Sequence, residues 1–363
     1  MSQFNRQKLH TFPLSERKHK LDFSQIAVSP DGTVPAVTLD VAAQIALTAE
    51  HIRAARACGR PVMLTYGAHL IKNGMSPVII RLMEDGYVTH AATNGAGSIH
   101  DWEFAYFGKS TEDVRANVAE GKFGIWEETG KYINLAVAVG GTQGLGYGAS
   151  IGKMIADDGL YIPSIDELRQ SIASATDEKI GAFADLVYMV TTFNIPAGRM
   201  EIKHINKGNS VQYAAYQMGI PFTVHPGIGY DIIYTHPMNC GGAIGRGSVW
   251  DFLTFTDSVS KLQGGVHLSV GSAIMAPMIF EKALSMAKNV ALQTGEALDD
   301  YYLVINDIQD GGGWNWNNGE PPMDNPAYYL RFCKSFYRMG GELDYICLDN
   351  RAFLMNLYNA LRK

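Results

Sequence analysis

Residues 61–69 read Pro-Val-Met-Leu-Thr-Tyr-Gly-Ala-His, an apolar run that ends in a turn of small residues. Four more apolar runs end in similar turns and lead into helix-like stretches; the runs are 88–93, 221–225, 266–270 and 302–305, with turns at 94–98, 226–229, 271–273 and 306–313. Strands that end in small residues and lead into helices are typical of a parallel α/β sheet. We therefore predict one such sheet with all five turns at its carboxyl edge, where sheets of this class bind ligands.

The regular alternation of strands and helices predicts a single Rossmann-like, doubly wound α/β domain over residues 37–363 of this 363-residue chain. Residues 1–36 are polar and contain three prolines and a basic cluster at 17–20, and we expect them to form an N-terminal arm. Apolar periodicity and stop signals predict several helices, at 41–58, 78–84, 165–189, 210–218, 280–290 and 352–361. Residues 99–160 are rich in glycine and are expected to be irregular apart from helical patches.

Composition excludes several classes of protein. The formal net charge of −6 gives no basic footprint for nucleic acid. The sequence has no apolar run of about 18 residues, which argues against a membrane span, and the N-terminus lacks the apolar core of a signal peptide. Four scattered cysteines favour free thiols in a cytoplasmic protein over a disulfide or zinc site. Only 18% of residues are charged, which suggests that an oligomer buries part of the surface.

The turn at 93–103 reads Thr-Asn-Gly-Ala-Gly-Ser-Ile-His-Asp-Trp-Glu and is the richest candidate for a cofactor site. Small residues let backbone amides approach an anion, and the start of the following helix favours negative charge. The candidate cofactor-binding residues in this turn are Asn94, Gly95, Ala96, Gly97 and His100. Asp101 is a candidate for substrate binding, and a structural alternative is that Ser98 or Asp101 caps the helix.

The turn at 67–74 is the matching feature after the first strand. Ala68 is a candidate cofactor contact and His69 a candidate substrate contact. Lys72 could bind a phosphate, or act as a nucleophile if it were desolvated. The alternative for Lys72 is an ordinary surface lysine near a helix start.

The last two turns add further candidates. Gly271 and Ser272 end a buried run and would allow a cofactor to approach closely, although packing alone would also explain them. Asn306 and Asp307 are candidate cofactor ligands, while Asp310, Trp314 and Trp316 are candidate substrate ligands because tryptophan faces attract cations. The alternative for this segment is a packed loop with structural aspartate turns.

His225, Asp231 and His236 bring two imidazoles and a carboxylate close together in sequence. They would suit a metal site, although their spacing matches no zinc signature. Asp231 also fits an anchor for a cationic substrate group, with His225 beside it. We expect no bound metal, and keep a metal-assisted hydrolase as an alternative.

Taken in order, these turns resemble those of deoxyhypusine synthase, and more closely its uncharacterised bacterial relatives. The resemblance spans roughly residues 40–340 and is poor between 105 and 210. The segment 66–74 resembles the first cofactor turn of the family, 93–103 resembles its second, and 231–233 resembles an Asp-Met-Ile motif that contacts polyamine. Residues 270–273 stand where the family has a glycine triplet, and 306–313 match its Asn-Thr-Ala-Gln-Glu-Phe-Asp-Gly in part.

The resemblance implies an NAD-dependent enzyme, assembled as a homotetramer, that moves the aminobutyl group of a polyamine through a lysine to an acceptor protein. Lys334 lies eight residues after Pro326, as the catalytic lysine of the family does after its own proline, and is therefore the candidate nucleophile together with Lys72. Three features depart from the family: residues 274–277 lack its catalytic histidine, Tyr328 replaces an acidic residue, and Ile99 and His100 replace a glutamate pair.

Without these groups, binding and deprotonating a polyamine would have to be done differently than in the family. We therefore expect a transferase-like enzyme of this family that uses NAD on an amine or polyamine-like small molecule, with an acceptor protein of unknown identity. The alternatives are a non-catalytic oligomeric nucleotide-binding protein that kept the fold, and the metal-assisted hydrolase.

Overall fold

The computed structural model describes residues 2–363, which form two compact units. Unit 1 comprises the described residues up to 26 together with 98–217 and 223–251, and unit 2 comprises 27–97, 218–222 and 252–363. The N-terminal arm and the single domain at 37–363 stay predictions. Leu14, Arg17 and Phe23 are nevertheless buried within unit 1, which the polar composition of this segment did not indicate.

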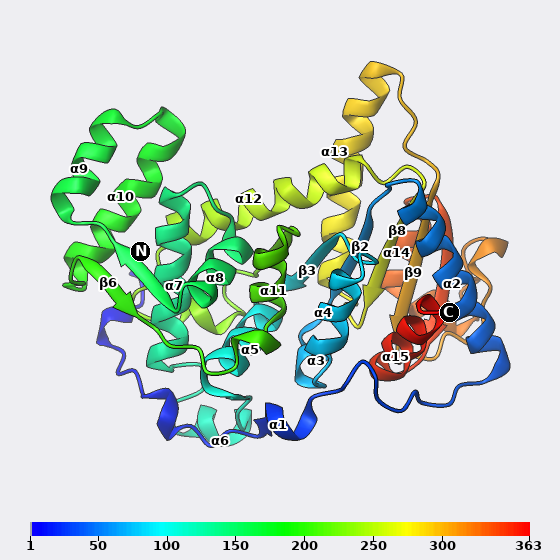
Figure 1. The fold of residues 1–363 in the computed structure, drawn as a ribbon, viewed down its shortest axis with the longest axis horizontal. Coiled ribbons are helices and arrows are strands. Elements are labelled where there is room, and N and C mark those ends of the chain that lie inside the picture. Colours follow the sequence, from blue (N-terminus) through cyan, green and yellow to red (C-terminus); the bar gives the residue numbers. More distant parts are fainter. Residues whose placement is uncertain (1) are drawn as a thin grey trace. The chain divides into compact units, whose positions relative to one another are not determined.

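A six-stranded sheet has the strand order β10-β9-β8-β2-β3-β7. Four of its strands, β3, β2, β8 and β9, are labelled in Figure 1. Its strands are β2 (Val62–Tyr66), β3 (His90–Asn94), β7 (Phe222–His225), β8 (Gly265–Val270), β9 (Tyr301–Asp307) and β10 (Glu342–Cys347). The pairs β10/β9, β9/β8, β8/β2 and β2/β3 are all parallel. Numbered in chain order, this is the 3-2-1-4-5-6 order of dinucleotide-binding sheets. The prediction of a doubly wound Rossmann-like fold is confirmed.

Strands β2, β3, β8 and β9 of unit 2 are buried along nearly their whole length, because helices cover both faces of the sheet. In β10, at the edge of the sheet, only Leu343 and Ile346 are buried. The helices of this unit are α2 (Leu39–Ala57), α3 (Ala68–Lys72), α4 (Ser76–Glu84), α13 (Met275–Thr294), α14 (Arg331–Tyr337) and α15 (Asn350–Leu361), with the 3-10 turns η5 (Trp316–Asn318) and η6 (Pro326–Tyr329). Helix α15 packs on α2 and α4, and α13 packs on α14. Met63, Leu303 and Ile305 point from the strands into the core that contains Phe280 of α13 and Phe336 of α14.

Unit 1 is mainly helical. Its elements are η1 (Arg6–Lys8), η2 (Leu14–Glu16), β1 (Leu21–Asp22), α1 (Phe23–Ile26), β4 (Lys109–Ser110), α6 (Val114–Ala119), α7 (Glu127–Thr142), α8 (Tyr147–Ala156), β5 (Gly159–Ile162), α9 (Ile165–Ser174), α10 (Asp177–Thr192), β6 (Gly198–Glu201), η3 (Lys207–Asn209), α11 (Val211–Met218) and η4 (Ile232–Tyr234). Strands β1/β4 and β5/β6 form two small antiparallel sheets. Helices α5 (Gly95–Phe107) and α12 (Gly241–Ser260), strand β7 and the last residue of α11 carry the chain from one unit into the other.

The expectation that 99–160 would be irregular was wrong, because α5, α7 and α8 occupy most of this segment. Glycines that lower helix propensity are used here for close packing. A methyl group on Gly140 of α7 would lie 2.5 Å from Cβ of Ser150 on α8. The helix predicted at 165–189 is in fact two helices, α9 and α10, with a new N-cap at Thr176.

The other predicted helices are confirmed with shifted ends. Helix α2 begins two residues earlier than predicted, where Thr38 caps it, and α13 extends from Met275 to a left-handed Gly295. Within residues 2–363, no helix has the length and apolar character needed to cross a membrane.

Candidate functional site

The sheet of unit 2 reverses its winding between β2 and β8, and the turns after these two strands touch. The Gly67 amide donates to the Val270 carbonyl at 3.1 Å, and a methyl group on Gly67 would lie 2.0 Å from the carbonyl oxygen of Gly271. Gly271 has φ +58°, a left-handed conformation that favours glycine. Both glycines are therefore needed for backbone packing at the switch point where such sheets bind dinucleotides. Ala68, the next residue, is half-buried at the start of α3.

Asn94, the last residue of β3, caps the turn that follows this strand. The side-chain oxygen of Asn94 accepts from the Gly97 amide at 2.8 Å, so Asn94 caps this turn rather than Ser98 or Asp101. Gly95, Ala96 and Gly97 form the first turn of α5. A methyl group on Gly97 would lie 2.1 Å from Oγ1 of Thr93. The predicted small residues thus lie at the carboxyl edge, but a typical dinucleotide sheet has a carboxylate near the end of this strand.

Asn306 joins the carboxyl ends of β9 and β10. Its Nδ2 donates to the carbonyls of Ile346 at 3.1 Å and Leu348 at 2.8 Å. Its Oδ1 is buried and accepts no hydrogen bond from the described residues. An acceptor left open at a ligand edge fits a hydroxyl donor such as a ribose or an ordered water. Asp307 is half-buried beside it.

Two other features of this edge have simple structural explanations. Ser272 is buried, and its Oγ accepts from the amide of Ala276 in the first turn of α13. Asn73 donates through Nδ2 to Oδ1 of Asn350 at 2.9 Å, which ties the first turn to α15. Sequence reasoning missed the Asn73–Asn350 contact because nothing local indicates that positions 277 residues apart meet.

A cavity of about 330 Å³ lies beside β10 and brings together three residues predicted to bind substrate, Asp310, Trp314 and Trp316. Asp344 and Tyr345 of β10 also line it, and its lining contains no lysine, arginine or histidine. Trp316 is buried, and its Nε1 has no partner among the described residues. Carboxylates and indole faces without a cation of their own make a site suited to a positively charged ligand.

The alternative interpretation of this loop is also partly correct. Oδ1 of Asp307 accepts from the Gln309 amide at 3.2 Å, and Oδ1 of Asp310 accepts from the Gly312 amide at 2.8 Å. Both are aspartate turns of the expected kind. Asp310 remains exposed, so its second carboxylate oxygen is available to a ligand.

The two candidate catalytic lysines have different surroundings. Lys334 is half-buried on α14, and its Nζ lies 3.5 Å from the ring centroid of Tyr328. The aromatic face stabilises the charged ammonium, which is the opposite of what a nucleophilic amine needs. Lys72 is half-buried at the end of α3, near the exposed His69. Burial, followed by the charge of Lys72, lowers the pKa of His69.

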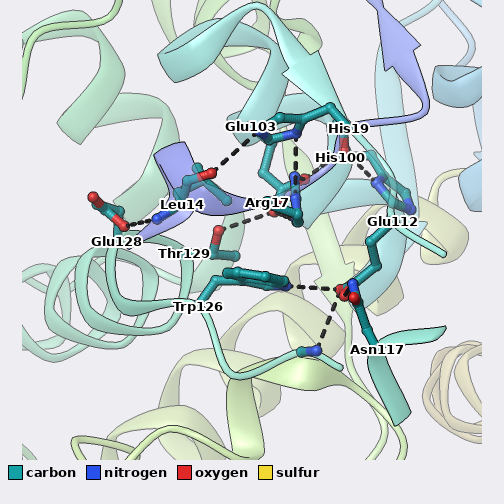
Figure 2. A network of polar contacts seen from close by, with 12 residues as sticks. Leu14, Arg17, His19, His100, Glu103, Glu112, Asn117, Trp126, Glu128 and Thr129 are labelled. Atoms are coloured by element: carbon teal, nitrogen blue, oxygen red, sulfur yellow. Dashed lines mark hydrogen bonds and ion pairs between the residues drawn. The ribbon is translucent and has the colours of Figure 1, made fainter. Parts of the chain in front are cut away.

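In unit 1, the candidate cofactor ligand His100 belongs to a buried polar network (Figure 2). Its Nδ1 lies 2.7 Å from Oγ of Ser110, which in turn donates to Glu103. Glu103 forms two hydrogen bonds with Arg17 and accepts a third from Thr129. Burial acts to raise the pKa of Glu103, but the charge and hydrogen bonds of Arg17 outweigh it and the pKa is lowered. These contacts give His100 a structural setting, and a role in cofactor binding stays a prediction.

Asp101 lies inside α5 and caps α11. Its Oδ1 accepts from the Val211 amide at 2.9 Å, and its Oδ2 accepts from Ser210 and from both the backbone and side chain of Gln212. Burial raises the pKa of Asp101, opposed by these hydrogen bonds. The carboxylate therefore has a clear structural role, and substrate binding by Asp101 stays a prediction.

Asp231 is a buried carboxylate for which the described residues provide no ion-pair partner. Its Oδ2 accepts from the Gly227 amide at 2.6 Å, and burial raises its pKa to about 6. The pKa of Tyr147 is raised mainly by burial and secondly by the negative charge of Asp231. The same two causes raise the pKa of Tyr234 to about 12. An ionised carboxylate in this setting would gain from a cationic partner.

The three residues of the metal alternative are engaged separately. His225 is buried 3.1 Å from Oγ1 of Thr223, and burial lowers its pKa to about 3. His236 contacts Glu127 instead. Among residues 2–363 there is no group of three or more histidine, cysteine, aspartate or glutamate side chains that could hold a metal. The idea that His225, Asp231 and His236 form one metal site was therefore wrong.

Comparison with protein-family models and with curated proteins gives no match. Among solved structures, the complex of AgrE with ornithine and NAD+ has a TM-score of 0.43 and 16% identity, covering 91% of this chain and 34% of AgrE. ArgZ, an arginine dihydrolase from the ornithine–ammonia cycle in cyanobacteria, has a TM-score of 0.40 and 16% identity, covering 90% and 33%. A conserved protein of Methanococcus maripaludis S2 designated LOR/SDH has a TM-score of 0.42 and 13% identity, covering 92% and 73%.

The chain thus spans about a third of the length of AgrE and ArgZ. At these identities and TM-scores, the likeness assigns neither an activity nor a substrate to this chain.

Proposed function

We propose that this chain is an NAD-linked enzyme that acts on an amine. The observation that carries the proposal is the strand order of the sheet, with its reversal between β2 and β8 and the glycines of both turns packed at that point. Gly95, Ala96 and Gly97 at the start of α5, with Asn306 and Asp307 at the end of β9, would hold the dinucleotide. Bound NAD would supply a hydride acceptor.

The open Oδ1 of Asn306 supports this fit, since it can accept a hydrogen bond from a ribose hydroxyl. Because β3 does not end in a carboxylate, we expect the adenosine ribose to be bound by other groups than in a typical dinucleotide-binding sheet. Asn94, which stands there, already uses its oxygen for the Gly97 amide.

The amine part of the proposal rests on the cavity beside β10. Asp310 and Asp344 supply negative charge there, and Trp314 adds an aromatic face. An ammonium group would be attracted to both, whereas an anionic substrate would be repelled. Asp231 in unit 1 is a third carboxylate able to accept a cationic group.

The finer proposal, which rests on the resemblance to deoxyhypusine synthase, is the transfer of an aminoalkyl group through Lys334. The chemistry requires this lysine to leave the Tyr328 face and lose its proton before it attacks. The contact between Lys334 and Tyr328 also favours a second candidate, an oligomeric nucleotide-binding protein without catalysis.

Activity assays separate these proposals. The purified protein is incubated with NAD and a panel of amines, including putrescine, spermidine and ornithine, and formation of reduced nicotinamide is followed by its absorbance. We expect reduction with at least one amine and a loss of at least about tenfold in kcat/KM for Asp310→Asn, because one carboxylate of the cavity loses its charge. Asp324→Asn, at an exposed position outside the cavity lining, is the matched control and should change nothing.

Each outcome favours one candidate. Activity that survives Lys334→Met would remove the aminoalkyl-transfer route but leave the NAD-linked enzyme. NAD binding without reduction by any amine would favour the non-catalytic protein. If neither binding nor reduction were seen, both would be contradicted.

A further inference from the structure

A second cavity, of about 230 Å³, lies wholly within unit 1 and is unrelated to the candidate cofactor and amine residues. It opens beside the start of α7, where Glu127 and Lys131 lie one helical turn apart. Its volume is below the roughly 300–1,000 Å³ typical of pockets for drug-sized ligands, so any occupant is a small molecule.

One wall of this cavity carries the charge of Glu127, which two neighbouring side chains hold in place. Oε2 of Glu127 accepts from Oγ1 of Thr11 at 2.6 Å and lies 3.3 Å from Nε2 of His236. Thr11 is positioned by its neighbour Phe12, which bonds through its backbone to Ile125 and Glu127. The amide of Met238 donates to Nδ1 of His236, so the ring proton is on Nε2 and points to Glu127.

Lys131 supplies the opposite charge. Its Nζ lies 3.6 Å from Oε1 of Glu127, and both side chains are about one-third exposed. This is a loose pair, because a strong charge-assisted hydrogen bond is nearer 2.8 Å. Each group therefore keeps the capacity to bind a ligand group of opposite sign. Hydrogen bonding by His236 lowers the pKa of Glu127 to about 2, against burial, so the carboxylate is charged at physiological pH.

The other wall is apolar and is built by the end of α10. Asn194 takes a left-handed conformation with φ +50°, and the Ile195 amide closes the helix end on the Val190 carbonyl at 3.0 Å. This turn directs Phe193 and Ile195 to the cavity, and Met200 of β6 and Met238 complete the apolar lining. Methionine adapts to ligands of varied shape.

We propose that this cavity binds a small α-amino acid with an apolar side chain. The ligand ammonium pairs with Glu127, its carboxylate pairs with Lys131, and its side chain lies against Phe193, Ile195 and the methionines. A ligand with only one charge would leave one member of the Glu127–Lys131 pair without a new partner. A zwitterion matches the zero net charge of this pair, and the apolar wall selects its side chain.

Calorimetric titration of the full chain tests this site with four probes: L-leucine, L-methionine, isobutylamine and isovalerate. We expect one amino acid to bind per chain with Kd in the micromolar to low millimolar range, and each singly charged probe to bind at least about tenfold more weakly. Lys131→Met should weaken amino-acid binding at least about tenfold but leave isobutylamine binding unchanged, because the amine does not use Lys131.

Lys153→Met is the matched control, since Lys153 also pairs with an acidic residue four positions away on a helix of unit 1 but does not line the cavity. Circular dichroism of each variant excludes unfolding as the cause of any loss. No heat from either amino acid at about 10 mM would overturn the proposal. An equal effect of Lys131→Met and Lys153→Met, or isobutylamine binding as tight as that of leucine, would do the same.

Discussion

Arg17 and Glu103 form a buried ion pair at the centre of the polar network of unit 1 (Figure 2). Their side chains are 2% and 1% exposed, and hydroxyl groups of Ser110 and Thr129 satisfy the remaining acceptors of Glu103. Burying two charges is costly, and it is tolerated here because each oxygen and the guanidinium have partners. At the scale of single residues, this pair anchors the N-terminal segment to the helices of unit 1.

Arg17→Met is therefore expected to lower the free energy of unfolding by about 3–5 kcal/mol, because it leaves the charge of Glu103 buried without a partner. Urea unfolding followed by circular dichroism measures the change. The double variant Arg17→Met/Glu103→Leu should recover much of the loss. Lys122→Met, which breaks the exposed pair with Glu120, should cost less than about 1 kcal/mol. Equal losses in the Arg17 and Lys122 variants would contradict a special role for the buried pair.

Asp231 makes a pH-dependent contribution to stability. Burial raises its pKa in the folded chain to about 6, above the ordinary 3.8, so the folded state binds more protons between these values. The free energy of unfolding contributed by this group is highest below 3.8 and falls as pH rises through about 6. This group should change the free energy of unfolding by up to about 3 kcal/mol between pH 3.8 and about 6, and Asp231→Asn should remove that change. A pH profile of urea unfolding that is identical in the two proteins would show that Asp231 is not buried as described.

At the scale of elements, close backbone approach explains much of the glycine content. Gly67 and Gly271 join the turns of β2 and β8, and Gly140 lets α7 pack on α8. The five predicted strands correspond to β2, β3, β7, β8 and β9, because each is a mainly apolar run that ends in such a turn. Strand β10 was not predicted, because Glu342 and Asp344 interrupt its apolar pattern. Helices α7 and α8 were not, because the glycines that fit them together lower the local helix signal.

Gly67→Ala is expected to destabilise the protein by about 2 kcal/mol or more, because the added methyl group would lie 2.0 Å from a backbone oxygen that cannot move freely. Gly245→Ala on α12 is the matched control. A methyl group there meets no atom within 4 Å, so the change should stabilise the helix by about 0.5–1 kcal/mol. Thermal unfolding of both variants gives the comparison, and a neutral Gly67→Ala would contradict the tight contact.

Residues that are close in sequence account for only part of the candidate site. Asp310, Trp314 and Trp316 are close in sequence, and the structure brings them to one cavity. Asp344 and Tyr345 line the same cavity from β10, and only the pairing of β10 with β9 brings them there. The separate engagement of His225 and His236 likewise depends on contacts that local spacing cannot reveal.

For the whole molecule, the class of sheet could be predicted from the sequence, but the order of its strands could not. Alternating strands and helices indicate a doubly wound sheet, while the position of the reversal between β2 and β8 follows from the structure. The low charge content led us to expect an oligomer, and α13 exposes Met278, Val290 and Leu292 to a large degree. We propose a homotetramer, the assembly that the resemblance to deoxyhypusine synthase implies, and light scattering during gel filtration should give about four times the chain mass of 39.7 kDa. A mass of one chain at micromolar concentration would contradict it.

We propose that the carboxyl edge of the sheet binds NAD, and isothermal titration of NAD into the purified chain measures this binding. We expect one site per chain with Kd below about 1 mM. Ala68→Glu should weaken binding at least about tenfold, because it places a bulky anion where the dinucleotide phosphates would lie. Ala46→Glu, at an exposed position on α2, should bind as the unchanged protein does. The absence of binding at about 1 mM NAD, or equal binding by Ala68→Glu, would contradict an NAD site at this edge of the sheet.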